Sequence, residues 1–220
     1  MEDQTPYLLD SDLGEAEEYF LNAIEPAVAA MSRSLFLAWP SPGAPADLRT
    51  FANFEQWKRI ILATSLKPGV PTLPTLKFWR AQKLYLLGWL DMDLIKAGEL
   101  QALAALEFTV RDQYGGCFPR TKKQIKDDWR PTFAMLLKYM VTDDHLTDDK
   151  LPIVQRCGGS VIGGLTGDRR PTLADIRNEQ AHGQSLDGLL IGGLLDVIHD
   201  LIEYAYRNRI SVYGGAAQPT

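Results

Sequence analysis

The chain has 220 residues, of which 45% are hydrophobic and 23% are charged. This composition is ordinary for a globular protein and supplies enough Leu, Ile, Phe and Trp for a sizeable core. The formal net charge is −5, so the surface as a whole does not attract phosphate, and a nucleic-acid function would require a local basic patch. Basic residues gather over residues 120–130 and 156–177; the alternative for both stretches is ordinary solvated surface.

The two cysteines, Cys117 and Cys157, lie far apart and form neither a disulfide framework nor a CxxC metal clip. The N-terminal segment is acidic and lacks the apolar centre of a signal peptide. No apolar run approaches the roughly 20 residues that span a bilayer. We therefore expect a cytoplasmic protein that has no contact with a membrane.

Helical periodicity dominates the chain, and no convincing β alternation is present. Ser11-Asp12 predicts the N-cap of a first helix that continues to about residue 31 and contains Pro26. Further helices are predicted over residues 51–65, 78–89, 91–114, 129–141, 173–181 and 185–209. In the last of these, Asp196, Asp200 and Glu203 are expected on the face opposite the apolar one.

Two Pro-rich segments, residues 39–47 and 67–75, are predicted as connections because proline cannot continue a helix. They separate residues 1–76 from the rest of the chain. The sequence therefore predicts an all-α fold: a bundle of four to five core helices over residues 77–213, with an N-terminal helical extension over residues 1–76.

A glycine-rich segment, residues 158–167, is predicted as a flexible loop. It lacks the Lys-Ser/Thr ending of a phosphate-binding loop, so we do not expect it to bind a nucleotide. The next two residues, Arg169 and Arg170, are candidate substrate-binding cations near a site.

Histidines are few, and none stands at helical spacing from another, so we predict no metal site and no cofactor. His145 lies among acids and is expected to be solvated. His199 lies at the edge of an apolar helix face and is expected to make a structural hydrogen bond.

His182 belongs to the segment IRNEQAHG, residues 176–183. In a helix over residues 173–182, Asn178 and His182 are four residues apart and share a face. Arg177 lies at the margin of that face and can reach it. Arginine binds phosphate oxygens with a planar fork, histidine exchanges protons near neutral pH, and the amide can orient the imidazole or hold a ribose hydroxyl. These groups suffice to cleave RNA through its own 2′-hydroxyl; alternatively, Arg177 and His182 only cap helix carbonyls.

A second pair of charges, Glu107 and Arg111, falls in the middle of the apolar stripe of the predicted helix over residues 91–114. The two residues are four apart and can pair. Charges that face inward are costly unless they pair or line a cleft. Two interpretations stay open: the pair supports the site and orients Arg177 or His182, or it is a buried ion pair that fixes helix register.

The pattern Arg177-Asn178-x-x-x-His182 resembles the R-polar-x3–5-H signature of the HEPN superfamily. Members of this superfamily are small all-helical bundles found in prokaryotic toxin–antitoxin and antiviral systems and in RNA-processing enzymes. Some members carry a Tyr shortly after the His, whereas this chain has Gly183-Gln184.

The resemblance covers about residues 91–210. Within it, Ala97–Arg111 is similar to the first core helix of the family, and the last predicted helix is similar to the final one. Residues 1–76 have no counterpart in the resemblance.

The resemblance implies a metal-independent endoribonuclease that acts as a homodimer and leaves a 2′,3′-cyclic phosphate. By position, Arg177 would be the phosphate-binding cation, Asn178 the polar helper and His182 the catalytic imidazole. RNA would be the substrate, and an antitoxin or effector protein would be a possible further partner. The alternative is a non-catalytic HEPN-like scaffold that dimerises or binds RNA.

Overall fold

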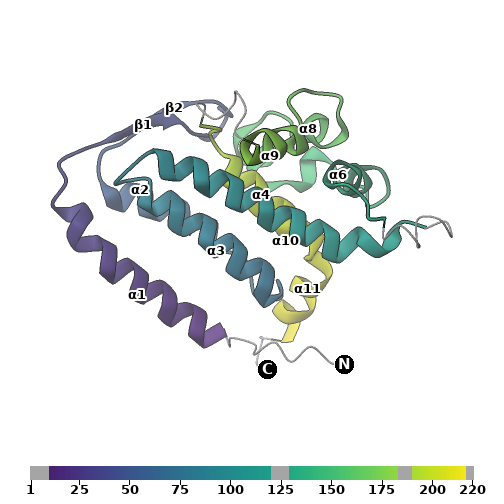
Figure 1. Ribbon diagram of the computed structural model, residues 1–220, viewed down its shortest axis with the longest axis horizontal. Coiled ribbons are helices and arrows are strands. Elements are labelled where there is room, and N and C mark those ends of the chain that lie inside the picture. The colour runs from purple at the N-terminus through teal and green to yellow at the C-terminus, as the bar shows by residue number, and fades with distance from the viewer. Residues whose placement is uncertain (1–9, 120–128, 183–189, 217–220) are drawn as a thin grey trace.

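The computed structural model describes residues 10–119, 129–182 and 190–216. Helices dominate it and only one small sheet is present in the described residues, so the prediction of an all-α helical fold is confirmed (Figure 1). The helices are α1 (Asp10–Ala29), α2 (Phe54–Leu62), α3 (Thr72–Leu87), α4 (Asp93–Tyr114), α6 (Phe133–Thr142), α7 (Pro152–Cys157), α8 (Ile162–Thr166), α9 (Leu173–Ala181), α10 (Leu194–Ala205) and α11 (Arg207–Ala216). Single 3₁₀ turns occupy Gly115–Cys117 and Asp148–Lys150.

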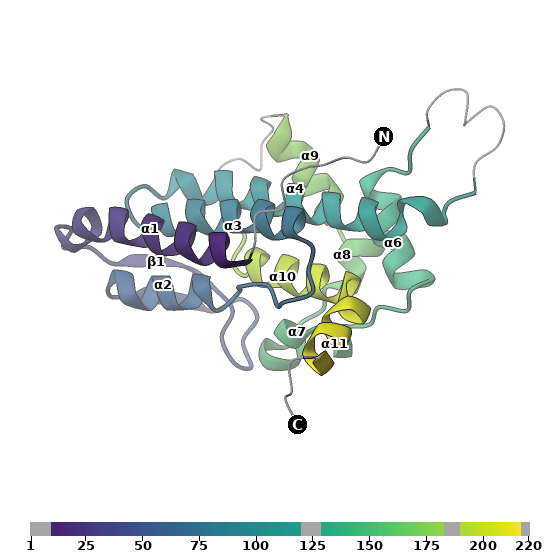
Figure 2. The same ribbon diagram turned by 90° about the horizontal axis from the view of Figure 1, so that it is seen from below.

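The centre of the molecule is the pair α3 and α4, which pack side by side, with α10 against α4 (Figures 1 and 2). Apolar residues at helical spacing on these three helices form the core, and α10 is buried on nearly all sides. Side chains with no exposed surface there include Ala81, Leu86, Ala102, Leu103, Leu106, Val110, Leu195, Ile198 and Leu201. The shorter helices α6 and α9 then pack on the outer face of α4.

A small antiparallel hairpin precedes α2, with β1 (Leu35–Ala38) paired to β2 (Leu48–Phe51). The sequence analysis did not predict these strands, because four residues each are too few to show a clear alternation. The Pro-rich segment 39–47 forms the connection between them. The hairpin is held by tertiary packing, since Leu35 and Phe51 are each only 1% exposed.

An aromatic cluster joins this N-terminal part to the rest of the chain. Trp57 has no exposed surface, and its Nε1 donates to the backbone oxygen of Tyr85 at 2.8 Å. Trp39 packs edge-on against both rings. Residues on the two sides of the predicted boundary at residue 76 therefore share one buried cluster, and the boundary itself falls inside α3.

Several helix ends differ from the prediction. The helix α3 begins at Thr72 because Pro74 lies in its first turn, where a missing N–H costs nothing. The helix α6 begins only at Phe133, capped by Thr132, and α8 occupies part of the predicted flexible loop.

The predicted long last helix is two helices, α10 and α11, and its first residues, 185–189, lie outside the described residues. The helix cannot extend back from Leu194 because Gly193 has φ +76°. A Cβ on Gly192 would lie 2.2 Å from the backbone oxygen of Ala38. This glycine therefore lets the chain pass directly against β1.

The acidic face of α10 is buried rather than exposed, which corrects the prediction for Asp196, Asp200 and Glu203. Each acid has a specific partner that offsets the cost of burying its charge. Arg156 binds Asp196 at 2.9 Å, and the backbone N–H of Ile153 donates to Asp200 at 2.6 Å. Helical periodicity could not reveal these partners, which come from a separate helix, α7.

The third acid, Glu203, binds Lys67 at 2.6 Å and His199 at 3.2 Å. His199 also contacts Asp200 at 2.9 Å, so its predicted structural hydrogen bond is confirmed. Burial alone would lower the pKa of His199, but the hydrogen bonds to Asp200 and Glu203 raise it to about 9. The imidazole is therefore protonated at neutral pH and completes a buried ionic network.

No helix in the described parts of the chain is both long and apolar enough to cross a membrane.

Candidate functional site

The predicted motif lies on α9, which has the predicted bounds Leu173–Ala181. A capping box begins the helix: Thr172 Oγ1 accepts from the N–H of Asp175, and the Asp175 carboxylate accepts from the N–H of Thr172, both at 3.0 Å. The N–H of Thr172, followed by a contact with Arg170, lowers the pKa of Asp175. His182 is the C-cap residue, and its backbone N–H donates to the oxygen of Asn178 at 3.0 Å. Gly183, which follows His182, lies outside the described residues.

The carboxylate of Glu107 on α4 joins two arginines. One oxygen contacts Arg177 Nη2 at 2.7 Å, and the other contacts Arg111 Nη2 at 2.7 Å. Arg111 Nη1 also donates to the backbone oxygen of Pro131 at 3.1 Å, and Arg177 Nη1 donates to the side-chain oxygen of Asn178 at 3.1 Å. Glu107 therefore connects α4 to α9, and Arg111 extends this connection to the segment that leads into α6.

These side chains line an open cavity of about 870 Å³ between α4, α6 and α9. Its lining residues are Glu107, Arg111, Arg130, Pro131, Thr132, Phe133, Ala134, Ala174, Arg177 and Asn178. Among these residues, the guanidinium groups of Arg111 and Arg177 both contact the carboxylate of Glu107, so this cluster of three side chains has a formal surplus of one positive charge. A chain with a net charge of −5 thus has the local basic patch that binding of phosphate would require.

His182 does not line this cavity. It is exposed, and its imidazole makes no hydrogen bond or ion pair with any residue in the described ranges. It lies one helical turn, about 6 Å along the axis, beyond Asn178. The structure thus brings Glu107, Arg111, Arg177 and Asn178 together and leaves the imidazole accessible at the end of the same helix.

The two predicted substrate-binding cations, Arg169 and Arg170, are exposed and lie before α9, at the end opposite to His182. Neither lines the cavity. Arg170 forms an ion pair with Asp175, so its guanidinium supports the helix N-terminus.

Two further groups near the motif, Thr132 and Glu99, were not predicted from the sequence. Thr132 lines the cavity, and its Oγ1 caps α6 by accepting from the N–H of Met135 at 3.3 Å. Glu99 binds Gln180 on α9. The rule that singled out Glu107, an acid within an apolar helix stripe, applies equally to Glu99 and could have identified it.

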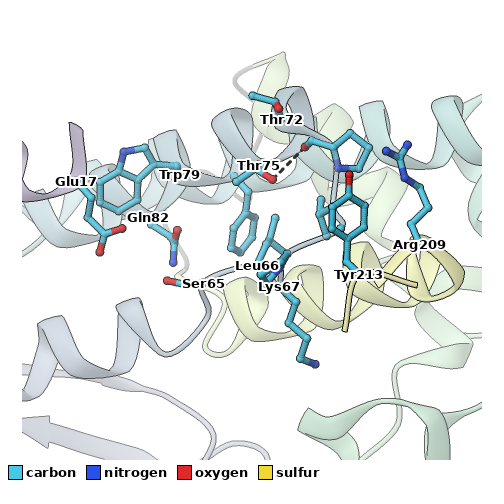
Figure 3. A pocket seen from close by; sticks show the side chains of 15 residues that line it. Glu17, Ser65, Leu66, Lys67, Thr72, Thr75, Trp79, Gln82, Arg209 and Tyr213 are labelled. Carbon is cyan, nitrogen blue, oxygen red and sulfur yellow. Dashed lines mark hydrogen bonds between the residues drawn. The ribbon is translucent and has the colours of Figure 1, made fainter. Parts of the chain in front are cut away.

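A second cavity, of about 460 Å³, lies between α1, α3 and α11, far in sequence from the motif (Figure 3). Its walls include Glu17, Trp79, Gln82, Arg209 and Tyr213. Burial raises the pKa of Glu17. None of the predicted site residues lines this cavity, so it is separate from the chemistry of the motif.

Comparison with models of protein families, with curated proteins and with solved structures found no match. Within residues 10–119, 129–182 and 190–216, no group of three or more His, Cys, Asp or Glu side chains is arranged to hold a metal ion. The functional interpretation therefore rests on the cationic cavity and the accessible imidazole. A guanidinium fork and an amide can bind and orient an anion, and the imidazole beside them can transfer protons.

Proposed function

We propose that the protein is an endoribonuclease of the HEPN type that cleaves RNA without a metal ion and acts as a homodimer. The observation that carries the proposal is that Arg177 and Asn178 line an open cavity with surplus positive charge, while His182 stands accessible one turn away. This arrangement supports the roles that the motif implies. A cytoplasmic defence or toxin–antitoxin setting, with an antitoxin or effector as partner, belongs to the same proposal.

In the proposed reaction, the 2′-oxygen of a ribose attacks the adjacent phosphorus. The new bond from the 2′-oxygen to phosphorus forms while the bond from phosphorus to the 5′-oxygen breaks. The products are a 2′,3′-cyclic phosphate and a free 5′-hydroxyl. The 2′-hydroxyl proton goes to a base, and the leaving 5′-oxygen takes a proton from an acid.

Arg177 would bind the non-bridging phosphate oxygens and stabilise the charge that builds up on them. Glu107 and Asn178 occupy one donor each on its two terminal nitrogens, which orients the guanidinium plane and leaves its other N–H groups for the phosphate. His182 would transfer a proton. Each chain carries one such imidazole, whereas the reaction needs both a base and an acid, so two copies of the chain would supply both.

The experiment is cleavage of end-labelled RNA by the purified protein with and without EDTA. We expect cleavage that persists in EDTA, and a loss of at least about 100-fold in His182→Ala, as for removal of a general acid or base. Arg177→Lys keeps the charge but loses the planar fork, and should also lose most of the activity.

Matched controls are His145→Ala and Arg59→Ala, which remove an exposed histidine and an exposed arginine that do not line the cavity. Both should cleave like the wild type. Inhibition by EDTA, or normal cleavage by His182→Ala, would overturn the proposal.

A second candidate function is a non-catalytic scaffold that binds RNA or dimerises. It is favoured by the position of His182 outside the lining of the cavity that holds Arg177. Titration of labelled RNA at several salt concentrations separates the two candidates. Salt-sensitive binding that Arg177→Ala weakens, with no cleavage by the wild type, would support the scaffold.

The toxin setting has its own test, which is growth of cells that express the chain. Poor growth that His182→Ala relieves would support a toxin, and equal growth of cells with either chain would oppose it.

A further inference from the structure

The helix α4 carries a second carboxylate, Glu99, that binds the chain on both sides of His182. Glu99 has no exposed surface. Its Oε2 accepts from Gln180 Nε2 and from Lys96 Nζ, both at 2.9 Å, and its Oε1 accepts from the backbone N–H of Ile191 at 2.6 Å. All three neighbours donate hydrogen bonds, so both side-chain oxygens at position 99 must act as acceptors.

The contacts of Glu99 lie on both sides of His182 in the sequence. Gln180 lies two residues before His182, and Ile191 lies nine residues after it, just before α10. Gln180 Oε1 is buried and has no partner among the described residues, so the only hydrogen bond of its side chain there is the one to Glu99. One buried carboxylate therefore holds both described ends of the segment that contains His182.

Glu107 and Glu99 act on α9 at two different places. Glu107 binds Arg177, and Glu99 binds Gln180. The ion pair fixes the guanidinium, whereas the contact with Gln180 fixes the last turn, from which His182 projects. From the same helix, α4, Glu107 thus holds the part of α9 that carries Arg177, and Glu99 holds the part that leads to His182.

Burying this carboxylate is costly, which suggests a reason beyond packing. Burial raises the pKa of Glu99, and the N–H of Ile191, followed by Lys96 and Gln180, opposes this effect. An apolar side chain at this core position would avoid the cost of desolvation. What an apolar side chain could not do is bind Gln180 and the backbone of Ile191.

We infer that Glu99 is a positioning residue that sets the place of His182 relative to Arg177 by holding Gln180 and Ile191. Glu99 touches no substrate. The consequence for catalysis rests on the proposed ribonuclease function, whereas the consequence for the position of His182 does not.

The test is Glu99→Gln compared with the exchanged pair Glu99→Gln/Gln180→Glu. In Glu99→Gln, one acceptor oxygen becomes an NH₂ that would face the donor groups of Gln180 and Lys96 or of Ile191. The hydrogen bonds to that oxygen should therefore be lost. The exchanged pair restores an acceptor opposite Lys96 and a donor between α4 and α9, and keeps the net charge of the wild type. Glu179→Gln, a half-buried neighbour on α9, is the matched control for the loss of one charge.

Two readouts separate this inference from the proposed function. Hydrogen exchange of the backbone amides of His182 and Ile191 should quicken at least about tenfold in Glu99→Gln and recover in the exchanged pair. In RNA cleavage, kcat should fall about tenfold or more with KM nearly unchanged, and should recover likewise. Glu179→Gln should change neither readout.

Unchanged exchange at both amides in a folded Glu99→Gln protein overturns the inference, whether or not the wild type cleaves RNA. Faster exchange with an unchanged kcat overturns the catalytic part. A wild type that cleaves no RNA overturns the proposed function alone, because faster exchange that the exchanged pair reverses would still establish Glu99 as the residue that holds the end of α9.

Discussion

Replacing Glu107 with glutamine removes, at almost unchanged volume, a carboxylate that contacts both Arg111 and Arg177. Its side chain is 13% exposed, while those of Arg111 and Arg177 are 39% and 32% exposed. The pair is thus intermediate between exposed ion pairs, which contribute at most about 1 kcal/mol, and buried pairs, whose disruption costs about 3–5 kcal/mol. We expect Glu107→Gln to lower the free energy of unfolding by about 1–2 kcal/mol, which corresponds to a fall in Tm of about 2–8 °C.

The assay is urea unfolding of the wild type, Glu107→Gln, Arg177→Gln and the double variant. Because the residues are in contact, their effects should not add, and the coupling should be at least about 0.5 kcal/mol. Glu55→Gln removes a carboxylate that is 64% exposed and pairs with Lys58, so it should change stability by less than about 0.5 kcal/mol.

Glu107→Gln should also change the charge of the cavity, and this change should favour RNA binding although the protein is less stable. Without Glu107, the cavity gains positive surplus, so RNA should bind at least as tightly, while the loss of a fixed Arg177 should lower kcat. A Glu107→Gln protein as stable as the wild type, with additive effects in the double variant, would refute the reasoning, because the carboxylate would then not be holding the arginine.

Two further predictions concern stability away from the cavity. His199 has a folded pKa of about 9, raised above its ordinary 6.5, so its contribution is complete below about pH 6.5 and is lost as the pH rises through 9. The free energy of unfolding should therefore fall between these pH values in the wild type and much less in His199→Gln; parallel curves would contradict this. Gly192→Ala should destabilise the protein by about 1–3 kcal/mol, as overpacking does, because the new Cβ would meet the backbone oxygen of Ala38. The control is Gly164→Ala, whose Cβ would lie in open space. This variant should melt within about 2 °C of the wild type.

Helices whose capping residues and apolar spacing lie within a few neighbouring residues could be predicted from the sequence. The helix α9 has the bounds that the sequence predicts, and the capping box of Thr172 and Asp175 that begins it lies within four residues. The inward direction of Glu107 follows from helical geometry alone. Helical spacing also predicts the pairing of Glu107 with Arg111, but it could not decide whether Glu107 contacts Arg177 as well, since Arg177 lies on another helix.

Features that depend on distant packing were missed. The hairpin is defined by the burial of Phe51 and by the aromatic cluster around Trp57 rather than by its own pattern. Helical periodicity predicts the direction in which a side chain points but not which groups it contacts, so the acids of α10 were expected on an exposed face. Asp196 and Asp200 contact partners on α7 that lie 40 and 47 residues earlier in the chain.

The position of His182 outside the cavity lining is also a tertiary property. The sequence places the imidazole and the guanidinium on one helix. Which of them faces the cavity depends on how α9 is rotated against α4, and in the observed orientation Glu107 contacts Arg177 and Glu99 contacts Gln180.

The most direct test of the proposed chemistry is a single-atom change in the RNA. Once a cleavage site is mapped in the presence of EDTA, the nucleotide that carries the attacking 2′-hydroxyl is replaced by its 2′-deoxy form, and the same RNA is incubated with the wild-type protein. The account predicts that cleavage at that bond disappears while cleavage at other bonds continues, with a 2′,3′-cyclic phosphate on the remaining products. Undiminished cleavage at the deoxy position would contradict it, because the nucleophile would then not come from the RNA.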